Sequence, residues 1–126
     1  MRSRMERILV AIDQQHPQQE ALTHGCSLAK RIQARLYVLF VQNRALQNAH
    51  PARQRLELLV GYAKADGINI EYFVAEGGYE ESIVSFVQNH GITLLIHEQE
   101  HAGISAMQSV RHRVSCRVEI VTPQKR

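Results

Sequence analysis

The chain has 126 residues, 44% of them apolar, which suits one globular domain over residues 1–126 and excludes a disordered chain. Its net charge is +3, and because the lysines and arginines are scattered, no nucleic-acid-binding surface is indicated. No apolar run approaches the ~18 residues of a membrane span, and no signal-peptide core precedes Ile8, so we expect a cytoplasmic protein without membrane insertion.

The first half of the chain alternates between strand and helix patterns. Residues 8–12 form a continuous apolar run ended by Asp13, which is typical of a strand buried on both faces. A helical pattern opens at Pro17, with Gly25 inside it. Residues 36–41 are rich in β-forming side chains and predict a second buried strand.

The second half continues the alternation. The expected elements are a helix from Pro51 to Asp66-Gly67, an exposed edge strand over 68–74, a helix from Tyr79 to Asn89-His90-Gly91, a buried strand over 92–96, a short helix over 104–114 and a last strand over 118–121. Strands that alternate with helices of crossover length predict an α/β fold, a doubly wound parallel sheet with helices on both faces.

Five segments in this order and spacing resemble one known family. They are residues 7–13, 21–29, 36–41, 77–84 and 115–121, the last with Arg117 where the family usually has proline. Together they are similar to the universal stress protein (UspA-like) family over nearly the whole chain. The resemblance implies a five-stranded sheet in the order 3-2-1-4-5 and a role in stress response.

The resemblance also implies functional positions. Family members are usually dimeric, and the last strand, with Val118, Ile120 and Val121, is the expected homodimer edge. Members that bind ATP hold it outside the carboxyl ends of strands one and four. Asp13 matches the acidic residue that contacts the nucleoside in those members, and Val41 matches a position that lines the adenine pocket.

The loop after the fourth strand departs from the ATP-binding pattern of glycines. The first glycine position falls on or next to Glu98, the second falls near His101, and the nearest counterpart of the following Gly-Ser pair is Gln108-Ser109. Carboxylates close to a triphosphate would cost on the order of several kcal/mol. We therefore expect that half of a nucleoside site survives and that the triphosphate site does not.

Residues 97–101, His-Glu-Gln-Glu-His, satisfy the His-Glu-x-x-His pattern of zinc peptidases. That chemistry needs a helix, whereas this segment directly follows a strand, and a third ligand is not evident. We interpret the segment as a solvated polar loop for partner or subunit contact. Metal binding by His97 and His101 is the alternative.

Other chemistry-bearing residues have structural interpretations. Glu80 and Glu81 begin a helix, where carboxylates favour the positive end of the dipole. Cys26 and Cys116 stand in apolar contexts and are expected to be buried, while His16 and His112 are expected at the surface. No nucleophile-elbow context surrounds a serine, so no catalytic residue is assigned.

Three functions are compatible with these features. The first is a non-enzymatic stress-response module without a cofactor, which acts by homodimerisation and contact with a regulatory partner, alone or with a larger transporter or kinase. The second is a nucleoside- or nucleotide-binding protein, for ATP or an AMP-like molecule, that uses Asp13 and Val41 in the cleft above strands one and four. The third is a zinc hydrolase built on His97, Glu98 and His101.

Overall fold

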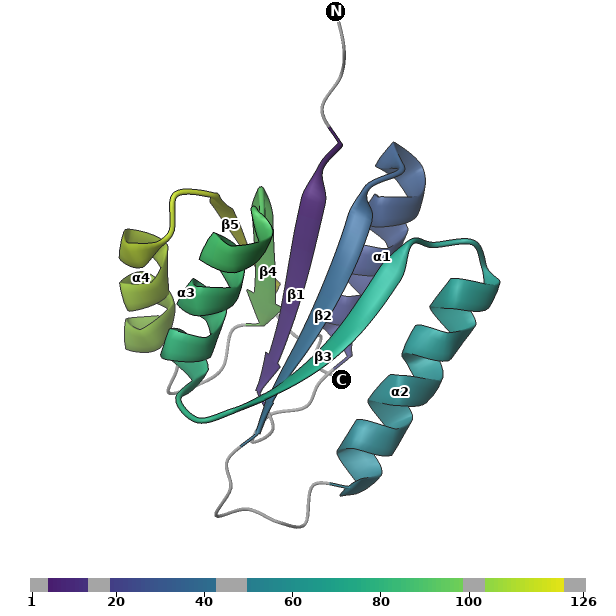
Figure 1. The fold of residues 1–126 in the computed structure, drawn as a ribbon, viewed down its shortest axis with the longest axis horizontal. Coiled ribbons are helices and arrows are strands. Elements are labelled where there is room, and N and C mark those ends of the chain that lie inside the picture. Colours follow the sequence, from purple (N-terminus) through teal and green to yellow (C-terminus); the bar gives the residue numbers. More distant parts are fainter. Residues whose placement is uncertain (1–4, 14–18, 43–49, 99–103, 122–126) are drawn as a thin grey trace, which may run out of the picture.

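The structure is a computed structural model that describes residues 5–13, 19–42, 50–98 and 104–121. Strands and helices alternate throughout this part of the chain, as the sequence predicts (Figure 1). The elements are β1 (Arg7–Asp13), α1 (Glu20–Ile32), β2 (Arg35–Gln42), α2 (His50–Ala65), β3 (Ile70–Glu76), α3 (Tyr79–His90), β4 (Leu94–Glu98), α4 (Ile104–Arg113) and β5 (Arg117–Val121).

All strand pairs in the sheet are parallel, and the strand order is β3-β2-β1-β4-β5. This confirms the order 3-2-1-4-5 that the family resemblance implies. The chain moves outward from β1 to β3 and then returns to the other side of β1, so the order reverses between β1 and β4. In open α/β sheets, ligands bind outside the carboxyl ends of the strands at such a reversal.

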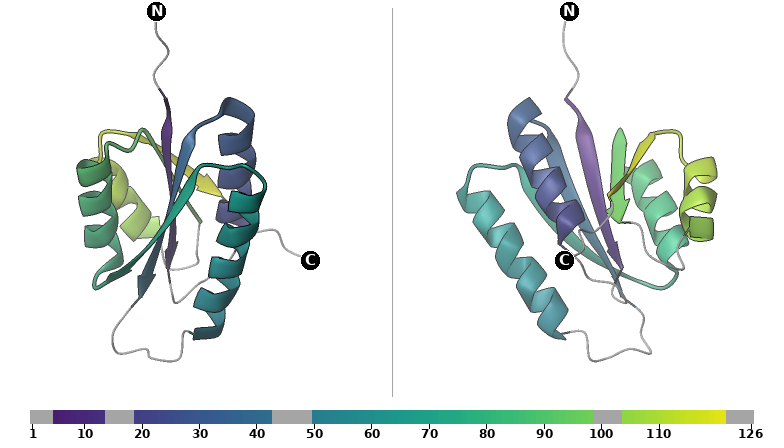
Figure 2. Two further views of the ribbon diagram at one scale, coloured as in Figure 1. Left: turned by 45° about the vertical axis from the view of Figure 1, so that its right-hand side comes forward. Right: turned by 180° about the vertical axis from the view of Figure 1, so that it is seen from behind.

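Helices cover both faces of the sheet, α1 and α2 on one and α3 and α4 on the other (Figure 2). Side chains of a strand alternate between its faces, and β1 supplies both cores in this way. Ile8 and Val10 pack with α1 and α2, whereas Leu9 and Ala11 pack with α3 and α4. Burial on both faces explains why β1 and β2 read as continuous apolar runs.

Helix α1 approaches the sheet closely at Gly25. A Cβ atom added there would lie 2.5 Å from Cγ2 of Val10, which is closer than side-chain atoms can pack. Gly25 is therefore required by the packing of α1 against β1.

The third strand lies at an edge of the sheet, as its alternating pattern predicts. Its side chains are less buried than those of β1 and β2, and Val74 is 39% exposed. The strand begins at Ile70, two residues after the predicted start at Ile68.

Two further expectations need correction. The fourth strand runs from Leu94 to Glu98 and not over 92–96, so that His97 belongs to the sheet. Cys26 and Cys116 are half-buried and not fully enclosed. Among the described helices, none combines the length and the apolar character that crossing a membrane requires.

Candidate functional site

The carboxyl ends of β1, β2 and β4 bring three candidate residues to one edge of the sheet. Asp13 is the register partner of Val41, so the last residue of β1 lies beside the end of β2. On the other side of β1, Ala11 is the register partner of His97. Parallel pairing therefore gathers residues that are far apart in sequence around the reversal of strand order.

The two positions expected at a nucleoside site are adjacent but differ in environment. Val41 is buried and packs in the core under α3 and α4. Asp13 is half-buried at the end of its strand. Because Leu9 and Ala11 face α3 and α4, strand alternation places Asp13 on the same side of the sheet as Val41. The structure thus places these two residues side by side at the ends of β1 and β2.

His97 occupies a different environment from the solvated loop expected for it. It lies in β4, and only 1% of its surface is exposed. Neither ring nitrogen has a hydrogen-bond partner within the part of the chain that the structure describes. Burial, and secondarily the positive charge of Arg111, lowers the pKa of His97 to about 4. The imidazole is therefore neutral at physiological pH.

Tyr79, the first residue of α3, lies over the same edge. Its hydroxyl donates a hydrogen bond to the backbone carbonyl of Ala11 across 3.4 Å, and its ring centroid is 6.5 Å from that of His97. Sequence reasoning identified Tyr79 only as the start of a helix. The sequence did contain a signal for this position of Tyr79. The residue directly follows the turn Gly77-Gly78, which leads from β3 into α3, so its side chain starts the helix at the edge of the sheet.

A polar cluster joins the first turn of α3 to α4. The Ser109 hydroxyl donates a hydrogen bond to the Glu80 carboxylate. Arg113 donates to Glu80 at 3.0 Å and to Glu81 at 2.8 Å. The hydrogen bond from Ser109 and those from Arg113 lower the pKa of Glu80, and Arg113 lowers the pKa of Glu81.

This cluster changes the interpretation of the two glutamates. Both lie in the first turn of α3, as expected, and their charge suits that end of the helix. The N-cap residue, Gly78, supplies no side-chain hydrogen bond. The specific partners of the glutamates are on α4, which sequence spacing alone did not indicate.

The zinc-peptidase pattern does not begin on a helix, because His97 and Glu98 belong to β4. His101, like His16 of the first loop, lies outside the described residues. Within the described ranges, no group of three histidine, cysteine or acidic side chains could hold a metal ion. The arrangement that places two histidines on one helical face is therefore wrong for this segment.

The residues expected at the dimer edge have separate environments on β5. Val118 packs against the core under α3 and α4, whereas Val121 packs against the core under α1 and α2. Ile120 is 36% exposed. Glu119 lies 3.0 Å from Nε2 of His24, which links β5 to α1. Ile120 and the strand backbone are thus the features of β5 that a partner could contact.

Comparisons with known proteins agree with this architecture. The model of the universal stress protein family matches residues 5–120. No curated protein matches the chain.

Three solved structures illustrate the similarity. Universal stress protein UspA from Lactobacillus plantarum is 18% identical, with a TM-score of 0.76 over 95% of this chain and 99% of that one. A universal stress protein in complex with cAMP is 20% identical, with a TM-score of 0.76 over 97% of this chain and 100% of that one. A universal stress protein from Archaeoglobus fulgidus in complex with dAMP is 16% identical, with a TM-score of 0.70 over 91% of this chain and 96% of that one.

At these identities the structural matches support the fold, while the family model spans nearly all of the chain. The strand order, the two helical layers and this match agree, and the chain belongs to the universal stress protein family.

Proposed function

We propose that this chain is a non-enzymatic, cytoplasmic regulatory module of the stress response that acts by homodimerisation and partner contact and does not bind ATP. The observation that carries the proposal is the cluster in which Glu80 accepts hydrogen bonds from Ser109 and Arg113. Ser109 and Arg113 belong to α4, and Glu80 lies in the first turn of α3, next to Tyr79, whose hydroxyl donates a hydrogen bond to the Ala11 carbonyl of β1.

The cluster opposes a triphosphate in two ways. Ser109 is the nearest counterpart of the serine that follows the phosphate-binding glycines in ATP-binding relatives, and here its hydroxyl already serves a carboxylate. Arg113, which could neutralise phosphate charge, is held between Glu80 and Glu81. A phosphate chain would have to displace these carboxylates or lie against them, and like charges at close range repel.

His97 adds no compensating charge at the end of β4. Because its pKa is lowered to about 4, the imidazole is neutral at pH 7 and offers no cation to an anionic ligand. Among the described residues, the positive charge that reaches this position comes from Arg111 of α4 and not from His97.

Calorimetric titration and thermal unfolding with Mg-ATP test this proposal. We expect no heat of binding and no stabilisation, whereas a ligand at 100 times its dissociation constant would add about 2.7 kcal/mol. The paired substitution Glu80→Gln and Glu81→Gln releases Arg113 and should create measurable affinity for inorganic triphosphate. The pair Glu71→Gln and Glu76→Gln, at exposed residues of β3, removes the same two charges and is the matched control for net charge. Saturable ATP binding by the unsubstituted protein would overturn the proposal.

The second candidate function is binding of a nucleoside or nucleoside monophosphate. The specific observation in its favour is that Asp13 and Val41 are direct register partners. Two structurally similar family members are complexes with cAMP and dAMP, ligands that carry one phosphate. Such a ligand needs less positive charge than a triphosphate does.

Thermal unfolding with adenosine, AMP, cAMP and dAMP separates this candidate from the first. Stabilisation by these ligands but not by ATP would favour a nucleoside site. Asp13→Asn should then reduce the stabilisation, and Glu71→Gln should not. If none of the four ligands stabilises the protein, the nucleoside site is excluded and the first proposal stands.

A further inference from the structure

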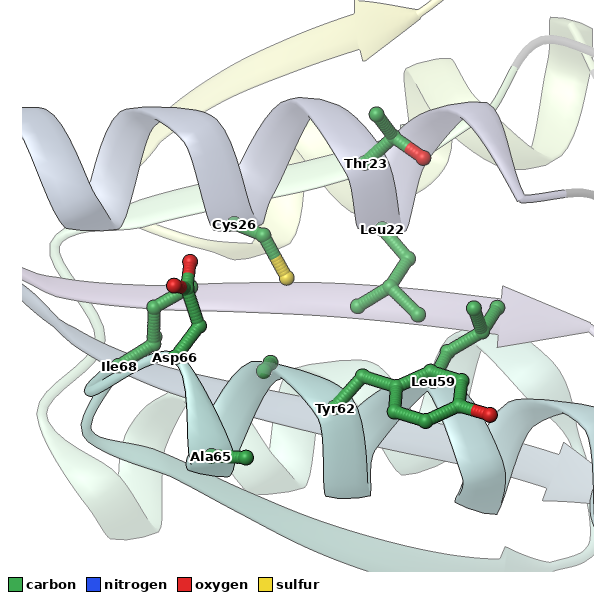
Figure 3. A pocket seen from close by; sticks show the side chains of 9 residues that line it. Leu22, Thr23, Cys26, Leu59, Tyr62, Ala65, Asp66 and Ile68 are labelled. Atoms are coloured by element: carbon green, nitrogen blue, oxygen red, sulfur yellow. The ribbon is translucent and has the colours of Figure 1, made fainter.

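A groove of about 550 Å³ lies between α1 and α2, on the face of the sheet away from α3 and α4 (Figure 3). Leu22 and Cys26 of α1 line one wall, and Leu59 and Ala63 of α2 line the other. The volume falls within the range of about 300–1,000 Å³ that is usual for small-molecule sites, which are also mostly apolar.

The apolar surface of the groove continues outward along α2. Tyr62 is 67% exposed and lies at the groove, and the neighbouring Leu58 is 59% exposed. Most large apolar side chains of this protein are buried, so two adjacent exposed ones beside a groove mark a contact surface. Burial of this surface by a ligand would release water from it.

One end of the groove carries a charge. Of the described residues that line it, Asp66 is the charged one. The Nζ atom of Lys30 donates a hydrogen bond of 2.8 Å to Oδ2 of Asp66, and both side chains are more than half exposed. Exposed pairs of this kind interact weakly, so Asp66 can share its carboxylate with a second cation.

The field of Asp66 reaches into the groove. The Cys26 sulfur points between the two helices (Figure 3), and its pKa is raised by burial and then by the charge of Asp66. The charge of Asp66 thus acts on the thiol inside the groove. A cationic group is favoured here, and an anionic group is opposed.

We propose that the groove between α1 and α2 binds a small amphiphilic cation, with its apolar body on Leu22, Leu59 and Ile68 and its ammonium group at Asp66. The body, a short alkyl chain or a single aromatic ring, removes apolar surface from water. The ammonium group forms a charge-assisted hydrogen bond with the carboxylate. The site is separate from the edge where β1 and β4 end, so it does not depend on nucleotide binding.

Octylammonium is the probe, with octanol and octanoate as controls of the same chain length but different charge. Alkylation rates at the two cysteines, resolved by mass spectrometry, report occupancy. Cys26 lies in the groove, whereas Cys116 packs against the opposite core and is the internal reference. At about ten times its dissociation constant, octylammonium should slow alkylation of Cys26 roughly tenfold and leave Cys116 unchanged.

A charge-neutral variant tests the role of Asp66. Asp66→Asn should abolish the preference for octylammonium over octanol, and Glu71→Gln should retain it. Methyl NMR shifts of Leu22, Leu59 and Ile68 on titration give a second measurement that does not depend on thiol reactivity. The proposal is overturned if octylammonium neither protects Cys26 nor shifts these methyls, or if octanol or octanoate protects equally well.

Discussion

The buried imidazole of His97 makes the stability of the protein depend on pH. In the unfolded chain a histidine titrates near pH 6.5, whereas burial lowers the pKa of His97 to about 4 in the folded state. Between these values the unfolded chain binds more protons than the folded one. The stability associated with His97 is therefore fully present above about pH 6.5 and declines as the pH falls towards 4.

Substitution of His97 by leucine tests this dependence. We expect His97→Leu to leave the free energy of unfolding at pH 7 unchanged or to raise it by about 1 kcal/mol, because an unpartnered polar ring is replaced by an apolar side chain. The unsubstituted protein should lose on the order of 3 kcal/mol more than the variant between pH 6.5 and 4. Urea unfolding at several pH values measures both quantities.

The control for this prediction is His112→Gln, since His112 is exposed on α4. It should follow the unsubstituted protein across the whole pH range. Carboxylates also protonate near pH 4, so the informative quantity is the difference between the His97 variant and its parent. Parallel pH profiles of the two would show that His97 does not titrate as a buried group.

The sequence predicted some site residues and missed others for identifiable reasons. Asp13 and Val41 could be placed because each ends a continuous apolar run, and parallel strands end at a common edge. His97 was misassigned because a polar residue after Ile96 was taken to end the strand. Its burial arises from α3 and α4, which cover that face. The available signal was alternation, because Leu95 and His97 share one face of β4.

The cluster of Glu80 and Arg113 could not be inferred from local pattern. These residues lie 33 positions apart, and their contact depends on how α3 packs beside α4. Helix-start preference explains why two acids stand in the first turn of α3. That preference does not identify Arg113 as their partner, because the contact forms only when α3 and α4 pack together in the folded protein.

At the level of whole elements, the periodicity of the sequence predicted the type and order of each strand and helix. The errors in strand starts share one cause. Ile68 and Ile92 each follow a glycine with positive φ, and each donates its backbone N–H to a carbonyl of the preceding helix, Ala63 and Val87 respectively. This is the Schellman geometry, in which an apolar residue after the glycine packs back on the helix. Apolar capping residues were therefore taken for the first residues of strands.

Replacement by alanine should have opposite effects on the free energy of unfolding at two helical glycines, Gly25 and Gly61. Gly25→Ala should destabilise the protein, because the added methyl would lie 2.5 Å from Val10 and overpacking costs ~1–3 kcal/mol, more than the ~1 kcal/mol gained in helix propensity. Gly61→Ala is the matched variant on α2, where no atom beyond the neighbouring backbone of the helix lies within 4 Å of the added methyl. It should stabilise by ~0.5–1 kcal/mol. Urea unfolding of both variants measures the two changes, and a gain for Gly25→Ala would contradict the close approach of α1 to β1.

The hydrogen bonds that join α3 to α4 predict that the pKa values of Glu80 and Glu81 change by different amounts when Arg113 is removed. Arg113→Gln should return the pKa of Glu81 to its ordinary range, because Arg113 alone lowers it. The pKa of Glu80 should rise only partly, since the hydrogen bond from Ser109 is the larger cause of its lowering and remains. Side-chain carboxyl NMR during a pH titration resolves both groups.

Arg111→Gln is the control for this titration, since Arg111 is a neighbouring cation that forms no described hydrogen bond with either glutamate. It should leave both pKa values unchanged. Both carboxylates have lowered pKa values, so the stability they contribute is present above the ordinary glutamate pKa and is lost as the pH falls through the lowered one. Equal shifts of the two groups on loss of Arg113 would contradict the role given to Ser109.

For the whole molecule, the open sheet leaves two outer strands, β3 and β5. An outer strand has backbone groups that can pair with another chain. The exposed charged residues of β3 are both acidic, Glu71 and Glu76, so self-pairing there brings like charges together. Strand β5 carries Arg117 and Glu119, which have opposite charges, and the exposed apolar Ile120. Self-association through β5 is therefore favoured over self-association through β3.

A pair of matched substitutions distinguishes the two edges. Ile120→Lys places a positive charge at an exposed residue near the end of β5, and both copies carry it in a twofold interface, so the dimer should dissociate at concentrations where the parent is dimeric. Val74→Lys makes the same change on β3, at a residue of similar exposure, and should leave the dimer intact. Sedimentation or light scattering over a concentration series measures the assembly, and urea unfolding verifies that both variants remain folded. If Val74→Lys dissociated the dimer and Ile120→Lys did not, the interface would be assigned to β3. If the parent protein were monomeric, homodimerisation would be removed from the proposed function.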